Sequence, residues 1–373
     1  MIYFDFAATT PMSEKAIASY TEAAKFAYGN SSSLHDIGGK AYELLTASRK
    51  AFAALLGGDP NGVYFTSGGS EGNILAIQSL LNSMPNKKHI IASSLEHASI
   101  DHYLSLLRAK GYDITFLKHD QNGNILMEHL EEEIREDTAL VTIQHGNSEI
   151  GTIQNIKEIG LFLKKRKIYF HTDCVQTFGK LLIPVDEMNA DAYTFSSHKI
   201  YGPKGVGAVY IHPAASWSPV IPGTTHEDGF RPGTVNVPGI FSFVTAANEF
   251  YNQREKHFNH FIKLRQHLIS QLKTQLPTIT IVNETKKEVL PNIVGVVTNS
   301  LEGQFVMLEL NRKGFAVSTG SACQAGNSHP SKTLLSIGFD KDSAHQFIRI
   351  SFGITNTISE VDELINAILS IVR

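Results

Sequence analysis

The sequence predicts an α/β protein in which a large domain with a mostly parallel, seven-stranded sheet is joined to a smaller α+β domain. Between about residues 60 and 210, short β-rich runs alternate with amphipathic stretches. This order favours a parallel sheet covered by helices on both faces. After Pro238 the alternation gives way to a long charged and apolar stretch, then to mixed strands and helices. With 373 residues, the chain is long enough for a large domain with a smaller companion.

The predicted sheet takes its strands from seven runs of β-favouring residues. These runs are residues 63–65, 89–92, 114–117, 139–143, 168–171, 192–195 and 206–210. Helical patterns lie between the earlier runs. For example, Ile74, Ile77 and Leu81 recur at a spacing that places them on one helix face.

The C-terminal third contains the elements of the smaller domain. One helix is expected from about Pro238 to Gln275, where it leaves the large domain. Strands are expected at residues 278–282, 293–297 and 347–350. In the last helix, one apolar stripe is formed by Val361, Leu364, Ile365, Ile368, Leu369 and Val372. We therefore expect a large domain over residues 14–255 and a small domain made of residues 1–13 and 256–373.

Composition and charge exclude several classes of protein. The net charge of -3 and the absence of a basic stripe argue against a direct nucleic-acid partner or a membrane surface. The N-terminal residues lack the features of a signal peptide, and no apolar run approaches the roughly 18 residues that span a bilayer. Two cysteines, Cys174 and Cys323, form no disulfide framework, so we expect a cytoplasmic protein.

Unusual polar residues follow the predicted strands. They lie in the segments 67–70, 96–97, 147–149, 173–176 and 196–199. Ligands of open α/β sheets bind beyond the carboxyl ends of the strands. We therefore expect these segments to form one site, and we expect no metal site.

Two of these segments suggest a phosphorylated cofactor. Residues 66–71 pass from a strand through glycines into a helix, where N–H groups and hydroxyls suit a phosphate, although an ordinary tight turn is the alternative. The segment matches neither the dinucleotide-binding nor the P-loop pattern, which disfavours a nicotinamide cofactor. Asp173 ends a buried strand and needs a cation there, such as the protonated pyridine nitrogen of pyridoxal 5'-phosphate (PLP). A helix N-cap is the alternative role for Asp173.

One lysine and one cysteine have settings that suit covalent chemistry. Lys199 follows a strand beside Ser196 and His198, which could bind phosphate, whereas the competing Lys204 lies in a Pro/Gly turn. Cys323 lies among small polar residues, as expected of an exposed reactive thiol. Cys174, at a strand end, is interpreted as a buried packing residue.

Six segments, in order and at matching spacing across nearly the whole chain, resemble the NifS/IscS-like cysteine desulfurases. The segments are 4–11, 66–71, 96–97, 171–176, 196–199 and 318–323. The resemblance implies the aminotransferase class V fold (PLP fold type I) and a homodimer. The stretch from Cys323 to Pro330 has the long form of this branch, and the shorter SufS-type form does not fit.

The resemblance also implies roles at the cofactor. Lys199 would be the Schiff-base lysine, Asp173 would pair with the pyridine nitrogen, and Gln176 with the phenolic oxygen. His97 would stack on the ring and shuttle protons. The phosphate would be held by Gly69, Ser70, Ser196 and His198, with Thr234 of the other subunit.

The substrate side of the implied site involves three further residues. Arg349, helped by Asn30, would clamp the carboxylate of L-cysteine in bidentate fashion. The Cys323 thiolate would take the substrate sulfur as a persulfide while L-alanine leaves, and would carry it to an acceptor protein. The acceptor would serve iron–sulfur cluster assembly, tRNA thiolation or another thio-cofactor pathway.

Two departures from the family pattern and two rival functions remain open. Ser148 stands where the family often has a second asparagine. The chain ends at Arg373 soon after its last predicted helix, which favours a dedicated acceptor over a standard iron–sulfur scaffold. The rivals are another PLP reaction, such as transamination or kynurenine or selenocysteine cleavage, and a catalytically silent interaction protein. Only Cys323 separates the first rival from a desulfurase, and Lys199, Asp173 and His97 together argue against the second.

Overall fold

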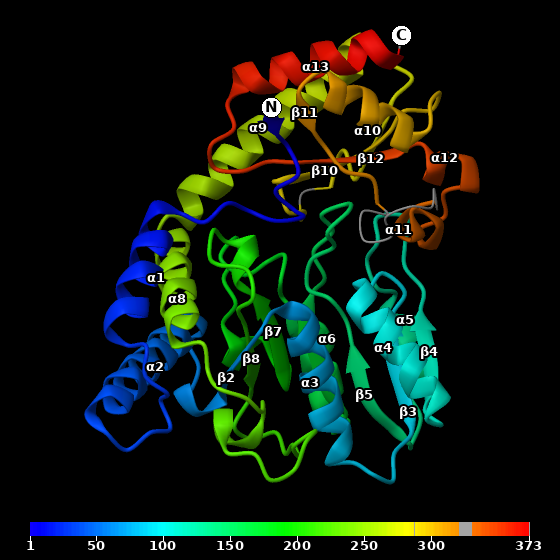
Figure 1. Ribbon diagram of the computed structural model, residues 1–373. Helices are drawn as coiled ribbons and strands as arrows, with labels where there is room; N and C mark the ends of the chain where they lie inside the picture. Colours follow the sequence, from blue (N-terminus) through cyan, green and yellow to red (C-terminus); the bar gives the residue numbers. More distant parts are fainter. Residues whose placement is uncertain (287, 321–329, 373) are drawn as a thin grey trace.

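The computed structural model describes residues 1–286, 288–320 and 330–372, and a large seven-stranded sheet lies at its centre (Figure 1). The sheet has the order β2-β8-β7-β6-β5-β3-β4. Its strands are β2 (Val63–Thr66), β3 (His89–Ser93), β4 (Asp113–Leu117), β5 (Thr138–Thr142), β6 (Tyr169–Asp173), β7 (Ala192–Ser196) and β8 (Gly207–Ile211). Strand β8 runs antiparallel to β2 and β7, and the other neighbours pair in parallel. The predicted mostly parallel sheet is confirmed.

Helices cover both faces of this sheet, as the alternating pattern predicts (Figure 1). One face packs on α3 (Gly69–Asn82) and α4 (Ala98–Ala109), and the other on α2 (Asp36–Leu56), α6 (Ile156–Lys165) and α8 (Val237–Asn252). Successive side chains of a strand point to opposite faces. In β3, Ile90 and Ala92 therefore join one apolar core while Ile91 joins the other.

A second, antiparallel sheet lies above the carboxyl ends of the large one in Figure 1. It consists of β12 (Phe347–Ser351), β10 (Ile293–Val297) and β9 (Thr280–Val282), in that order. The helices beside it are α9 (Arg254–Gln275), α10 (Gly303–Arg312) and α13 (Ile358–Val372). The predicted apolar stripe of the last helix is buried in α13 from Val361 to Leu369. The boundaries of the two domains stay a prediction.

The single helix predicted from Pro238 to Gln275 is wrong, because the structure divides this stretch into α8 and α9. Gln253 lies between them with φ −105° and ψ 9°, outside the helical range. The break lets α8 pack along α1 (Glu14–Phe26), while α9 continues to pack against α13. No glycine or proline marks the break, so the sequence pattern gave no sign of it.

The remaining elements are short or lie at the periphery. They are α5 (Met127–Glu133), α7 (Val185–Met188), α11 (Lys332–Ser336), α12 (Lys341–His345) and the 3-10 turns η1 (Pro60–Gly62), η2 (Ser197–Lys199) and η3 (His226–Gly229). Among the described residues, no helix is long and apolar enough to cross a membrane.

The N-terminal segment links the two sheets. Strand β1 (Ile2–Tyr3) pairs in parallel with β11 (Phe315–Ala316), and Asp5 forms a bridge with Ser351 of β12. Five residues later, the Thr10 N–H donates to the His198 carbonyl, 2.9 Å away, beside the end of β7. Residues 5–10 therefore run from the small sheet to the carboxyl edge of the large one.

Candidate active site

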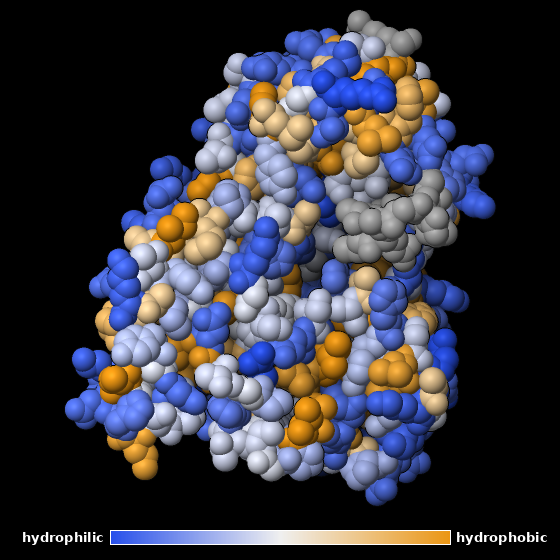
Figure 2. All heavy atoms as spheres, viewed as in Figure 1, coloured by the Kyte–Doolittle hydropathy of each residue, from blue (hydrophilic) through white to orange (hydrophobic). Residues whose placement is uncertain are grey.

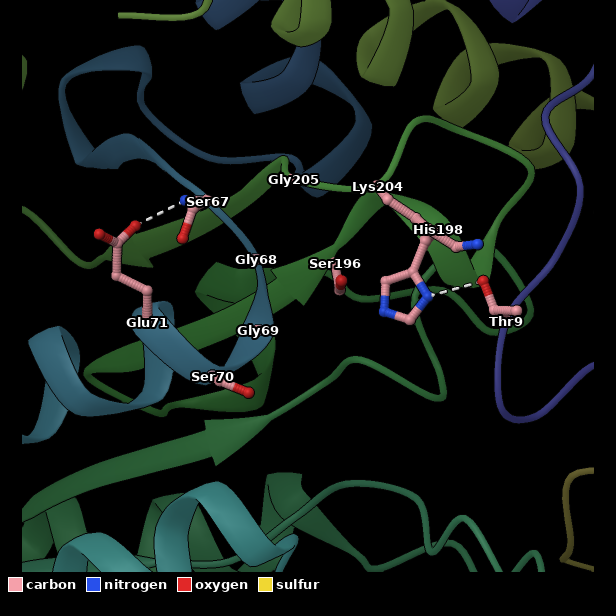
Figure 3. Close-up of a pocket in the computed structure, with 10 residues that line it drawn as sticks. All are labelled: Thr9, Ser67, Gly68, Gly69, Ser70, Glu71, Ser196, His198, Lys204 and Gly205. Carbon is pink, nitrogen blue, oxygen red and sulfur yellow. Dashed lines mark hydrogen bonds between the residues drawn. The ribbon is translucent and has the colours of Figure 1, made fainter. Parts of the chain in front are cut away.

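A pocket of about 350 Å³ opens at the carboxyl edge of the large sheet (Figure 3). Its lining is formed by Thr9, Ser67, Gly68, Gly69, Ser70, Glu71, Ser196, His198, Lys204 and Gly205. One wall is the turn that enters α3, and the other comes from the end of β7 and the residues after it. The structure thus brings together four residues expected at the phosphate: Gly69, Ser70, Ser196 and His198.

Two glycines allow the turn before α3 to adopt its shape. Gly68 has φ 155° and ψ −176°, a conformation that residues with a Cβ rarely adopt. A Cβ at Gly207 of β8 would lie 2.7 Å from the Gly68 Cα. Strand β8 can therefore pack this close to the turn only because residue 207 is a glycine. Gly68 also provides no side-chain cap for α3. The first residues of the helix, Gly69, Ser70 and Glu71, line the pocket, and no side-chain cap bonds their N–H groups, as an anion site requires.

The opposite wall of the pocket is polar, and one of its hydroxyl groups has no hydrogen-bond partner among the described residues. The Ser196 Oγ is buried and has no partner among the described residues. The His198 Nδ1 lies 3.1 Å from the Thr9 Oγ1 (Figure 3). Burial lowers the pKa of His198 to about 4, helped by the positive charges of Lys199 and Lys204. A neutral imidazole, an unmatched hydroxyl and nearby lysines suit a bound anion.

Lys199 and Gln176 meet at one backbone carbonyl. Lys199 ends η2, directly after β7, and its Nζ donates to the carbonyls of Ala7 (2.6 Å) and Ala8 (2.7 Å). The Gln176 Nε2 donates to the same Ala7 carbonyl, 3.0 Å away. The Gln176 Oε1 is buried without a partner among the described residues. Lys199 and Gln176, which the family resemblance assigns to the same cofactor, therefore lie close together.

Asp173 and His97 are connected through two intervening side chains. The Asn73 Nδ2 donates to the Asp173 Oδ2 (2.8 Å) and to the Ser99 Oγ (3.1 Å), which lies 2.8 Å from the His97 Nδ1. The Asp173 Oδ1 accepts the Val175 N–H at 2.8 Å. Asp173 thus caps a turn, and the alternative role as a helix N-cap is wrong because no helix begins there. Both oxygens of the Asp173 carboxylate accept hydrogen bonds, and these bonds fix the orientation of the side chain at the end of β6.

Arg349 lies in β12 with a buried guanidinium. Its Nη2 is 2.6 Å from the Asp5 Oδ1, and its Nη1 donates to the Ser148 carbonyl at 3.0 Å. The contact of Ser148 with Arg349 is made by the backbone, so the serine side chain does not alter it. Asn30 is exposed and its Oδ1 accepts the Ser32 N–H, so the described contacts do not bring Asn30 to Arg349.

Two further predicted residues do not line the pocket, and a third lies outside the part of the chain that the structure describes. Thr234 is exposed and does not line the pocket of its own chain, although Arg231 nearby pairs with Glu71 of the pocket wall at 2.8 Å. Cys323 lies outside the described residues. Cys174 is buried, with its Sγ 3.9 Å from the His145 Nδ1, and burial raises the pKa of its thiol. The interpretation of Cys174 as a packing residue agrees with this setting.

Lys204, which the sequence offered as the lysine competing with Lys199, lines the pocket. Sequence reasoning missed other residues of the site. Lys180 is buried, and its Nζ donates to the Gln176 carbonyl at 2.9 Å. Burial lowers its pKa to about 7, and the charge of Lys199 acts in the same direction. Asp5 and Asn73 were missed because their partners are distant in sequence. The only signal for Asp5 was its place in the N-terminal segment that resembles the family.

Comparison with known proteins identifies the family. Residues 2–364 match the family described as aminotransferase class-V. The chain belongs to this family. A "putative cysteine desulfurase NifS" of Bacillus subtilis is 47% identical over 98% of this chain and 93% of the relative. "Cysteine desulfurase IscS" of Methanosarcina thermophila is 37% identical over 100% and 92%. A solved structure titled "NIFS-LIKE PROTEIN" superposes with a TM-score of 0.92 at 31% identity, covering 99% of this chain and 98% of the other.

Class-V aminotransferases depend on PLP, and the residues of this pocket fit that group. The N-terminus of α3 and the unmatched Ser196 hydroxyl suit its phosphate. The oriented Asp173 carboxylate suits its protonated pyridine nitrogen, and the Gln176 amide lies close to Lys199, at the same Ala7 carbonyl. Lys199 lies in η2, directly beside this wall of the pocket.

Proposed function

We propose that this class-V aminotransferase is a cysteine desulfurase that takes sulfur from L-cysteine, releases L-alanine and passes the sulfur from Cys323 to an acceptor protein. The observation that carries the proposal is the arrangement at the carboxyl edge of the sheet. An anion pocket lies beside Lys199, and Lys199 shares the Ala7 carbonyl with Gln176. The names of the curated relatives support the choice of reaction within the family.

The cofactor would be held at four points. Lys199 would bind it covalently through Nζ, Asp173 would pair with the pyridine nitrogen, and Gln176 would face the phenolic oxygen. The phosphate would lie in the pocket against Gly69, Ser70, Ser196 and His198. When bound, PLP withdraws electrons from the substrate and so weakens the bonds around its α-carbon.

His97 has a defined tautomer for proton transfer. Its Nδ1 accepts the Ser99 N–H at 3.1 Å, so the neutral ring carries its proton on Nε2. The Ser99 hydroxyl, bonded to Asn73, reinforces this orientation. Nε2 is therefore the atom at which His97 would hold or release a proton. Lys199 Nζ, held by two carbonyls, is the second proton carrier.

Arg349 would bind the carboxylate of the amino-acid substrate. Its guanidinium is buried, which strengthens a charge-assisted pair with a carboxylate. Its Nε has no partner among the described residues and remains for a ligand. Asn30, which is exposed and has no described contact with Arg349, would help to bind this carboxylate through the site of the other subunit of the proposed dimer.

Cys323 would be the sulfur acceptor, a role assigned from its sequence setting. Its thiolate attacks the substrate sulfur, an S–S bond forms, and the C–S bond breaks. The released carbon takes a proton and leaves as L-alanine, while Cys323 keeps the persulfide. Carbon is reduced and sulfur is oxidised within the same reaction, so no external oxidant is needed.

We also propose that the enzyme acts as a cytoplasmic homodimer in which Thr234 reaches the phosphate site of the other subunit. Large apolar side chains are exposed on α1, at the start of α2 and in the loop between them, and the left margin of Figure 2 shows orange residues standing singly among blue ones. They include Ile17, Phe26, Tyr28, Leu34 and Ile37. Several large apolar side chains left exposed on consecutive elements support an interface with another chain there. The exposed Thr234, which does not line its own pocket, supports the same arrangement.

The test is an assay of alanine and sulfide from L-cysteine in the presence of a thiol reductant. We expect equal amounts of both, with the reductant releasing sulfide from Cys323. A transaminase would form neither product, and a catalytically silent protein would also form none. Absence of alanine from the PLP-loaded protein would refute the proposed function.

A further inference from the structure

Residues 5–9 contact three residues of the proposed active site, Arg349, Lys199 and His198. The Asp5 carboxylate pairs with Arg349, and the carbonyls of Ala7 and Ala8 accept the Lys199 Nζ. The Thr9 hydroxyl lies against His198 in the pocket wall (Figure 3). One short stretch of chain therefore joins the residue proposed for the substrate carboxylate to the residue proposed for the cofactor.

The pair of Asp5 and Arg349 is well ordered by its surroundings. The Arg349 side chain is 7% exposed and that of Asp5 is 19% exposed. The Arg349 Nη2 donates a hydrogen bond to the Asp5 carboxylate, and its Nη1 donates one to the Ser148 carbonyl. Two of the three guanidinium nitrogens are therefore held in place. Because the guanidinium is planar, these two bonds also set the direction of Nε. Nε is the buried donor without a partner among the described residues.

We infer that Asp5 is a positioning residue for substrate binding, which holds Arg349 so that the guanidinium edge bearing Nε receives the carboxylate of an α-amino acid. The inference rests on the proposed role of Arg349. Asp5 contacts only one nitrogen, so its carboxylate leaves Nε available. A group held in its binding orientation before the ligand arrives avoids the loss of side-chain freedom on binding. It also balances a buried positive charge that would otherwise be unpaired.

The same segment limits the distance between the two ends of the substrate site. Asp5 and Ala8 are three residues apart, and a fully extended chain of that length spans at most about 11 Å. An α-amino acid carries its carboxylate and its amino group on one carbon. A site in which Arg349 and Lys199 are held by one short segment suits this chemistry.

The test uses the full-length, PLP-loaded enzyme and four variants: Asp5→Ala, Asp5→Asn, Arg349→Ala and Asp113→Ala. Asp113 pairs with Arg135 at 2.6 Å on the surface and serves as the matched control for loss of an ion pair. Steady-state kinetics give KM and kcat for L-cysteine. Absorbance of the cofactor gives its occupancy and also the binding of cysteamine, which is L-cysteine without the carboxylate.

We expect Asp5→Ala to raise the KM for L-cysteine about tenfold with kcat within about twofold of the parent, because an interaction with the bound substrate is weakened. Cofactor content and cysteamine binding should be unchanged. Asp5→Asn keeps an oxygen opposite Nη2 and should give an intermediate KM. Asp113→Ala should behave as the parent enzyme.

The outcomes separate this inference from the proposed function. If Arg349→Ala raises KM and Asp5→Ala does not, the role of Asp5 is wrong while that of Arg349 stands. If neither raises KM, the proposed role of Arg349 fails, and that of Asp5 with it. Equal loss of L-cysteine and cysteamine binding in Asp5→Ala would show a merely structural role and overturn the inference. If Asp5→Ala does not fold, Asp5→Asn decides: an unchanged KM overturns the inference, and a raised KM with unchanged cysteamine binding supports it.

Discussion

Replacing Lys180 with methionine should stabilise the folded protein, and the gain should depend on pH. Lys180 is 8% exposed, and its Nζ is bonded to one backbone carbonyl. No carboxylate pairs with it within the described part of the chain. Burial, with Lys199 adding to it, lowers the pKa of Lys180 from 10.5 to about 7. Methionine fills a similar volume without a charge.

The expected gain follows from this shift. The fall in the pKa of Lys180 from 10.5 to about 7 corresponds to at most about 5 kcal/mol of unfavourable free energy for the charged folded form. Loss of the hydrogen bond to Gln176 offsets about 1 kcal/mol. Between about pH 7 and pH 10.5 the unfolded chain holds the lysine proton and the folded chain does not. Stability contributed by this site therefore rises with pH in that window. The advantage of Lys180→Met is largest below about pH 7 and shrinks by about 2–3 kcal/mol by about pH 9.

Urea unfolding of the PLP-loaded protein at several pH values tests this expectation, with the midpoint as the measured quantity. Lys157→Met is the matched control, because the Lys157 side chain is 65% exposed and its pair with Glu187 is expected to contribute little. The control midpoint should follow the parent at every pH. A Lys180→Met protein that is less stable than the parent below pH 7, or whose difference from the parent is the same at all pH values, would refute the reasoning.

Three further outcomes are expected. Borohydride reduction followed by peptide mapping should place the cofactor on Lys199, whereas an adduct on Lys204, which also lines the pocket, would contradict the assignment. Mixing Lys199→Ala chains with Thr234→Ala chains should restore activity in mixed dimers, because one of the two sites regains both residues; no recovery in mixed dimers that do form would exclude a shared site. Cys174→Ala should keep most of the activity, because burial raises the pKa of that thiol and leaves it a poor nucleophile; a loss comparable to that of a Lys199 variant would show a direct role.

Local patterns in the sequence predicted the elements that carry the site. The seven β-rich runs became the seven strands of the large sheet, since β-branched and apolar runs between helices have few other structures open to them. The rule that ligands bind beyond strand ends anticipated the pocket between the turn before α3 and the end of β7. Both predictions depend on residues that are close together in the sequence, and the local pattern of residue types is informative about such elements.

Contacts between distant residues could not be predicted in the same way. Asp5 and Arg349 are 344 residues apart, and nothing near either residue indicates the other. The burial of Lys180 depends on packing around the end of β6, while its sequence setting is that of an ordinary lysine. The break at Gln253 follows from the packing of α8 against α1 and of α9 against α13. The sequence has no glycine or proline at this position that would indicate a break.

The most direct test of the central claim is the reaction of Cys323→Ala with L-cysteine. The cofactor pocket is built from residues between Thr9 and Gly205, so removal of this thiol should leave PLP content and the cofactor spectrum intact. Binding of L-cysteine should still change that spectrum. Catalytic release of L-alanine should stop, because no nucleophile remains to take the substrate sulfur. Release of alanine by Cys323→Ala at the rate of the parent enzyme would contradict the account and would place the protein among PLP lyases that need no thiol.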